Sequence, residues 1–267
     1  MTQLPFELVW HWLLAYGVAL GRPLALVALN PVFTRAQIGG LLRGAIATAL
    51  AVPMVPRLAA TITPDLQAIP LLLLTVKEAA IGAAIGLLLG APFWALDVAG
   101  DVLDAQRGAT QGRLNDPAGF EDVSITGTLL MMTGIALFVL TGGLETLASL
   151  LYGSWDIWPP LAALPAMAPQ TPTLLLGVLD RITRQGLLLA VPPVLAMLLA
   201  DASLLIVARL APNLRIDDLA LSVRNAVFVA FMPLYAVFLV IYIRQDQAVL
   251  PRMLDLVRAA LPPLGAP

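Results

Sequence analysis

Long apolar runs alternate with shorter polar segments along most of the chain. Runs of about 20 mainly apolar residues are typical of helices that cross a membrane. The pattern predicts helical spans at residues 8–33, 39–62, 70–96, 123–142, 174–200 and 226–243. The N-terminus lacks the basic region and cleavage site of a signal peptide, so we expect the first span to be retained. The fold class that follows is an all-α, polytopic helical membrane protein.

Several predicted spans carry charged side chains. The third holds Lys77 and Glu78, and the fifth holds Arg181 and Arg184. Charged groups in a bilayer need partners in protein or water, so we expect these spans to pack against other helices, some from other subunits. Lys77 and Glu78 are adjacent and point about 100° apart on a helix, so we predict that they do not face each other. Lys77 either extends to the membrane interface or joins an aqueous conduit or inter-subunit ion pair.

The connections between spans give conflicting signals on topology. Residues 143–173 contain no Lys or Arg and are rich in Pro, Tyr and Trp, which favours a connection on the outer side of the membrane. Arginines in residues 201–225 and in the C-terminal tail favour the cytoplasm for both. One span cannot separate two cytoplasmic segments, so the pattern leaves the side of the last span open.

Three glycines in the third span recur at intervals of four residues, at Gly82, Gly86 and Gly90. They lie on one face of a helix, where small residues let another helix approach closely. We predict helix packing at this face, either within the chain or at a subunit interface.

The amino-acid composition supports a membrane protein and limits the kinds of metal and catalytic site that the chain can form. The chain is 60% hydrophobic and 12% charged, whereas soluble domains carry about 25% charged residues. Its net charge of −2 gives no reason to expect a nucleic-acid partner. Cysteine is absent and His11 is the single histidine, which leaves few routes to a metal site or to histidine-based catalysis. We expect no cofactor and no bound metal.

An acidic stripe precedes the central polar segment. Asp97, Asp101 and Asp104 are spaced to share one helix face. Clustered aspartates can hold Mg²⁺ and a diphosphate, as in membrane prenyltransferases, but Asp217 and Asp218 make a poor second cluster. The glycine–aspartate motif of intramembrane proteases and the common hydrolase and phosphate-binding motifs are missing. We therefore predict a solvated helix end and no enzymatic activity.

The segment DAQRGATQGRLNDPAGFED, residues 104–122, is polar and glycine-rich between two apolar spans. Its glycines permit left-handed backbone, and Asn115–Asp116–Pro117 is typical of a turn. It is either a solvated loop or a flexible segment inside an aqueous pathway, where irregular backbone is tolerated at membrane depth.

Four segments follow one another along the chain in this order: KEAAIGAAIG, AGDVLDAQRGATQGRLNDP, LYGSWDIWPP and RLAPNLRIDDLALSVRNAV. In this order the segments resemble the SctT family of type III secretion export-apparatus proteins, which includes YscT, HrcT and SpaR and has FliR as its flagellar homologue. The resemblance covers about residues 7–245.

The resemblance implies a non-enzymatic core subunit of an export gate in the bacterial inner membrane, within the secretion basal body. Residues 1–245 would form a single helical domain, and 246–267 a cytoplasmic tail. Expected partners are SctR-like (FliP-like) and SctS-like (FliQ-like) membrane subunits, an SctU/FlhB-like switch protein, unfolded secreted proteins and membrane lipid.

The resemblance also assigns a role to the polar segment. In this family the loop after the aspartate-rich helix projects into the pore and helps to plug it. That loop corresponds to residues 105–122 here, and its candidate plug residues are Gln106, Arg107, Gly108, Gly112, Arg113, Asn115, Pro117 and Gly119. The alternative is a small-molecule transporter or permease that uses Lys77, Glu78 and Arg184 as coupling charges.

Overall fold

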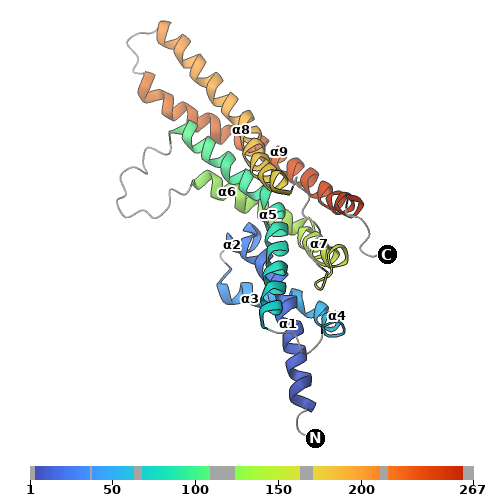
Figure 1. Ribbon diagram of the computed structural model, residues 1–267. Coiled ribbons are helices and arrows are strands. Elements are labelled where there is room, and N and C mark those ends of the chain that lie inside the picture. Colours follow the sequence, from blue (N-terminus) through green and yellow to red (C-terminus); the bar gives the residue numbers. More distant parts are fainter. Residues whose placement is uncertain are drawn as a thin grey trace. The chain divides into compact units, whose positions relative to one another are not determined.

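A computed structural model describes residues 4–36, 38–62, 68–108, 124–162, 171–210 and 216–260 (Figure 1). Helices are the only regular secondary structure within these ranges, which confirms the all-α prediction. In chain order they are α1 (Leu4–Leu29), α2 (Pro31–Thr34), α3 (Gly40–Ala51), the 3₁₀ turn η1 (Val52–Met54), α4 (Val55–Ala59), α5 (Ala68–Arg107), α6 (Ile125–Leu140), α7 (Gly143–Ile157), α8 (Thr171–Leu210) and α9 (Ile216–Ala260).

Five helical stretches in the described part of the chain are long and apolar enough to cross a membrane. They are Glu7–Leu29, Gly40–Ala59, Ala68–Arg107, Asp180–Leu210 and Leu219–Arg244, and α6 and α7 together pass the same test as a broken pair. Each predicted span overlaps one of these stretches. The polytopic prediction is confirmed, although α5 runs 11 residues past the expected end at residue 96.

The prediction of a connection over residues 143–173 is wrong for its first half, because α7 occupies Gly143–Ile157. Leu147, Leu150, Leu151 and Trp155 recur at helical spacing and are all buried. The proline and tryptophan content of this region favours an interfacial connection, whereas the apolar periodicity indicates a helix. Gly142, with φ of +83°, takes the left-handed backbone that separates α6 from α7.

The chain divides into two compact units. Unit 1 comprises residues 1–90, 142–175 and 247–267, and unit 2 comprises residues 91–141 and 176–246. Helices α5, α8 and α9 each contribute to both units. The expected single domain over 1–245 stays a prediction, while helix α9 continues beyond that boundary to Ala260.

In unit 1, α1 packs on α3, α4 and the first half of α5. A Cβ added at Gly82 would lie 2.1 Å from the carbonyl oxygen of Arg22, and one at Gly86 would lie 3.0 Å from that of Leu26. The two helices therefore touch through their backbones, which only glycine allows at Gly82. The break after α1 is fixed by Asn30, whose side chain accepts a hydrogen bond from the Val32 amide and so caps α2.

In unit 2, side chains from α5, α6, α8 and α9 form one apolar core. Leu96, Leu130, Leu189 and Tyr235 represent the four helices in it, and each is at most 6% exposed. Helices α5 and α6 meet at a pair of glycines, since a Cβ at Gly100 would lie 2.1 Å from the backbone of Gly127. This close approach brings the C-terminal end of α5 and the N-terminal end of α6 together.

Candidate functional site

The last turns of α5 and the first turn of α6 share a buried polar cluster in unit 2, formed by Asp104, Arg107, Ser124 and Thr126. Asp104 is 1% exposed and accepts on both carboxylate oxygens. Its Oδ2 accepts from the Ser124 hydroxyl at 2.7 Å and from the Thr126 amide at 3.1 Å, and its Oδ1 accepts from the Thr126 hydroxyl at 2.5 Å. We call these four residues the Asp104 cluster.

Ser124 holds the start of α6 in place for these contacts. Its side chain accepts a hydrogen bond from the Gly127 amide at 2.8 Å, so it is the N-cap of the helix. The carboxylate of Asp104 lies at the same helix end, where free amides and the helix dipole favour negative charge. Asp104 therefore acts as a second, tertiary cap supplied by α5.

Arg107 completes the cluster and α5 ends directly after it. Its guanidinium pairs with Asp104, donates to the Thr126 hydroxyl at 2.8 Å and lies 4.2 Å from the centre of the Phe228 ring. Charge pairing and cation–π contact together fix this side chain. Gly108 follows with φ of +72°, a left-handed conformation that suits glycine at a helix C-terminus.

The candidate plug residues fall partly within this geometry. Gln106 is half-buried on α5, and Arg107 and Gly108 are placed as described above. Gly112, Arg113, Asn115, Pro117 and Gly119 lie outside the described residues. Asp104 thus joins the end of α5 to the start of α6, the two helix ends that flank residues 109–123 in the sequence.

The prediction that the acidic stripe ends in a solvated helix terminus is wrong for Asp104. The neighbouring helix supplies three hydrogen-bond donors, and these replace water around the carboxylate. Asp101, by contrast, is exposed. No group of three or more acidic, histidine or cysteine side chains that could hold a metal ion occurs within the described ranges.

A second buried cluster lies in unit 1, around the charged residues of α1 and α5. Arg22 and Glu78 are both fully buried and form a two-pronged ion pair, with Nε to Oε2 at 2.8 Å and Nη2 to Oε1 at 3.1 Å. Arg22 also donates to the Ser154 hydroxyl at 2.9 Å, and the Trp155 ring nitrogen donates to Glu78 at 3.3 Å. We call Arg22, Lys77, Glu78, Ser154 and Trp155 the Arg22 cluster.

Lys77 joins this cluster, which corrects the prediction that it cannot face Glu78. Its Nζ lies 3.6 Å from Glu78 Oε1, because the long lysine stem reaches around the helix surface to its neighbour. The same nitrogen donates to the carbonyl oxygens of Pro160 and Ala162, the latter at 3.0 Å. Lys77 and Glu78 therefore both have the partners in other helices that the sequence led us to expect, and those partners belong to this chain.

The remaining candidate residues are more dispersed. Arg181 is half-buried and Arg184 exposed on α8. Gly82 and Gly86 meet α1 of the same chain, and Gly90 is buried. The structure thus gathers Lys77, Glu78 and the two glycines in unit 1.

Sequence reasoning missed the residues that complete both clusters. Arg22 lies within an apolar span, and nothing in the local sequence links it to Glu78. Ser124 carried a usable signal, since serine directly before an apolar helical run is typical of an N-cap. Phe228 carried none, because its contact with Arg107 depends on tertiary packing.

Comparison with known proteins identifies the family. The family model described as "Bacterial export proteins, family 1" matches residues 13–248. The chain is 34% identical over 230 residues to Yop proteins translocation protein T of Yersinia pestis, covering 86% of this chain and 88% of that protein. It is 28% identical over 228 residues to surface presentation of antigens protein SpaR of Salmonella typhimurium, covering 85% and 84%.

A flagellar protein is related over a similar length. Flagellar biosynthetic protein FliR of Escherichia coli is 28% identical over 246 residues, with 89% of this chain and 92% of that protein covered. These matches span nearly all of the helices described above. The chain therefore belongs to family 1 of the bacterial export proteins, the family of SctT and FliR.

Proposed function

We propose that the chain is a core subunit of a type III protein export gate in the bacterial inner membrane, where it helps to form and plug the entry pore for unfolded proteins. Its relatives are named for Yop translocation and for flagellar biosynthesis, which supports a role in protein export. The proposal assigns the plug to residues 105–122. The partners would be the SctR-like, SctS-like and SctU-like components expected from the resemblance.

The observation that carries the plug assignment is the Asp104 cluster. A plug must be able to move while its attachment to the pore wall stays fixed. Asp104 joins the last turn of α5 to the first turn of α6 through buried hydrogen bonds, so both ends of the segment are anchored at one place. Glycine-rich, polar sequence between fixed ends can rearrange at low energetic cost.

Exposed apolar helix faces support assembly with other subunits. On the first half of α5, Ile69, Leu72, Leu73 and Val76 follow helical spacing and are each more than half exposed. Such a stripe requires lipid or another helix as its neighbour. In the proposed gate, SctR-like and SctS-like helices cover faces of this kind.

The alternative of a transporter loses support from the Arg22 cluster. A coupling carboxylate must exchange protons or ions with water during the transport cycle. Glu78 is fully buried, and its oxygens accept from Arg22 and Trp155 while lying near Lys77. This arrangement is typical of a structural ion pair.

The gate assignment is tested by purification of the tagged chain from its native host in mild detergent, with mass spectrometry of the proteins that accompany it. We expect several copies each of two smaller helical membrane proteins. Recovery of the chain alone, monodisperse and stable, would contradict the assignment.

The plug assignment is tested separately in the assembled complex. Deletion of residues 108–119 should leave assembly intact and raise ion leakage through reconstituted vesicles. Thr126→Val removes one hydroxyl from the Asp104 cluster and should raise leakage less. Thr133→Val is the matched control, because that hydroxyl is exposed and donates to the Leu129 carbonyl oxygen of its own helix. Normal impermeability after the deletion would exclude the plug role.

A further inference from the structure

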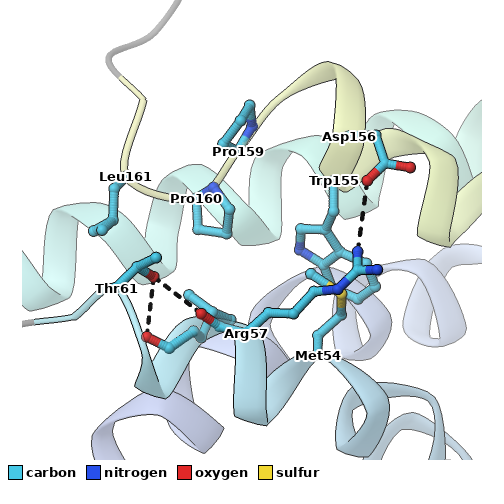
Figure 2. Close-up of a pocket in the computed structure, with 9 residues that line it drawn as sticks. Met54, Arg57, Thr61, Trp155, Asp156, Pro159, Pro160 and Leu161 are labelled. Atoms are coloured by element: carbon cyan, nitrogen blue, oxygen red, sulfur yellow. Dashed lines mark hydrogen bonds and ion pairs between the residues drawn. The ribbon is translucent and has the colours of Figure 1, made fainter.

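The charged side chains of the described residues differ in how firmly their surroundings hold them. Figure 2 shows an exposed example in unit 1, the pair of Arg57 and Asp156 beside a small pocket. The two groups lie 3.6 Å apart and are 71% and 65% exposed, and ion pairs of this kind contribute little to stability. The Arg107 side chain in unit 2 is only 16% exposed, so water and salt screen its contacts much less. These contacts therefore fix the end of α5 more firmly than a surface pair could.

Helix α9 supplies the ring that covers the Arg107 guanidinium. The guanidinium carbon lies 4.2 Å from the ring centre of Phe228, which is 7% exposed in the core of unit 2. The Arg107 Nε is buried without a hydrogen-bond partner among the described residues, while Nη2 donates to Asp104 and Thr126. A cation over an aromatic face is attracted more strongly where water is excluded than at an exposed site. The Phe228 ring therefore helps to position Arg107, in addition to the rest of the Asp104 cluster.

The next residue of the chain, Gly108, also lies against α9. A Cβ added at Gly108 would lie 3.2 Å from the Cδ1 atom of Leu221. Leu221 and Phe228 are seven residues apart, which is about two helical turns, so they share one face of α9. This face thus contacts both the last residue of α5 and the first residue after it. We call the contacts of Leu221 with Gly108 and of Phe228 with Arg107 the α9 contact.

Helix α9 is itself held on α8 by an ion pair. Arg224 lies between Leu221 and Phe228 in the sequence, and its Nε donates to Asp201 Oδ1 at 2.7 Å. The Arg224 and Asp201 side chains are 32% and 19% exposed, so this pair is partly shielded from water. The α9 contact therefore connects the end of α5 to α8 and α9, whereas Asp104 connects it to α6.

We propose that Phe228 is a positioning residue for the plug: its ring holds Arg107 in the closed gate, and the plug moves aside only when Arg107 and Gly108 separate from α9. This inference rests on the proposed plug function of residues 105–122. Asp104 joins the helix ends on either side of the plug, and the α9 contact sets the direction in which the chain leaves α5. A small number of contacts suits a gate, because a closed state favoured by a small free-energy difference can be shifted by a substrate.

The first test is ion leakage through vesicles that contain the assembled complex. Phe228→Leu keeps an apolar side chain but removes the ring, so it should raise leakage about tenfold, the effect of losing a largely desolvated cation–π contact. Phe228→Tyr keeps the ring and should leave the gate closed. Phe138→Leu is the matched control and should leave leakage unchanged, because it removes a ring of unit 2 that is 4% exposed and contacts Phe93, not a guanidinium.

Combination with Arg107→Gln separates positioning from simple packing. Glutamine has no positive charge for the ring to attract, so in that background Phe228→Leu should change leakage by less than about twofold. A purely structural role of Phe228 would add the same tenfold increase in both backgrounds, and that result would overturn the proposal. Arg57→Gln controls for the loss of an arginine, because its ion pair is exposed and belongs to unit 1.

A cysteine pair tests the opening step without relying on leakage, and the chain has no cysteine of its own. Gly108→Cys with Leu221→Cys should form a disulfide on oxidation when no substrate is being exported, and the disulfide should block secretion until it is reduced. Gly108→Cys alone controls for strain at the positive φ of Gly108, and oxidation should not change its secretion. Failure of the pair to cross-link, or continued secretion by the cross-linked complex, would overturn the proposal.

Comparison with the deletion of residues 108–119 separates the role of Phe228 from the plug assignment itself. If the deletion leaks and Phe228→Leu does not, the role of Phe228 is refuted while the plug assignment stands. If neither variant leaks, the plug assignment and the role of Phe228 are refuted together.

Discussion

Replacing Glu78 by glutamine should strongly destabilise unit 1. The substitution keeps the size of the side chain but removes the only carboxylate of the Arg22 cluster, leaving Arg22 buried and Lys77 nearby. Breaking a buried ion pair from one side costs about 3–5 kcal/mol, because an uncompensated charge stays in the interior. That cost corresponds to a roughly 150- to 5,000-fold change in the unfolding equilibrium.

The assay is a titration of the purified protein with a denaturing detergent, followed by tryptophan fluorescence. Glu145→Gln is the matched control, because Glu145 is exposed on α7 and its loss should change stability by at most about 0.5 kcal/mol. The double variant Arg22→Met with Glu78→Leu should be less destabilised than the sum of its single substitutions, since it removes both members of the buried ion pair and leaves only Lys77, which keeps its bonds to the carbonyl oxygens of Pro160 and Ala162. A loss below about 1 kcal/mol for Glu78→Gln would refute the reasoning, because a fully buried pair cannot be broken so cheaply.

Two further substitutions test the packing of each unit. Gly82→Ala should lower the free energy of unfolding by about 1–3 kcal/mol, because the added Cβ would lie 2.1 Å from the Arg22 carbonyl oxygen. Gly44→Ala is the control: Gly44 has open space around it, so alanine should raise the free energy of unfolding by about 0.5–1 kcal/mol. Equal effects of the two substitutions in the same titration would contradict the close contact of α1 and α5. Tyr235→Phe should leave the stability of unit 2 unchanged or raise it by about 1 kcal/mol, because the buried Tyr235 hydroxyl has no hydrogen-bond partner among the described residues. A marked loss of thermal stability would instead show that this hydroxyl has a partner in the assembled protein.

The hydrophobic pattern predicted the helical class and the approximate spans because each signal is local. In a membrane, the backbone N–H and C=O groups of a long apolar run have no water to bond, so they must bond to one another. A helix meets this requirement within a single segment. The interval of four residues from Gly82 to Gly86 likewise follows from helix geometry. The sequence pattern does not predict α7, because the Trp- and Pro-rich sequence at its end is more typical of an interfacial connection than of a helix end.

The two polar clusters could not be predicted because each depends on residues distant in sequence. Arg22 and Glu78 are 56 positions apart, and no spacing rule connects them. Asp104 and Ser124 are separated by the whole polar segment, so the burial of the carboxylate depends on how α6 returns to α5. The contact between Lys77 and Glu78 arises from the flexibility of the lysine stem, which a rule based on Cα directions omits.

The sequence separation within the Arg22–Glu78 pair has a consequence for biogenesis. Chains are synthesised at about 5–20 residues per second, so the 56 positions that separate Arg22 from Glu78 correspond to a delay of roughly 3–11 s. During that delay α1 carries a guanidinium without its carboxylate, and an arginine at the centre of an inserted helix costs about 2.5–3.5 kcal/mol or more. We therefore expect α1 to take its final place only after α5 has been synthesised, so that the ion pair sets the order in which the helices of unit 1 assemble.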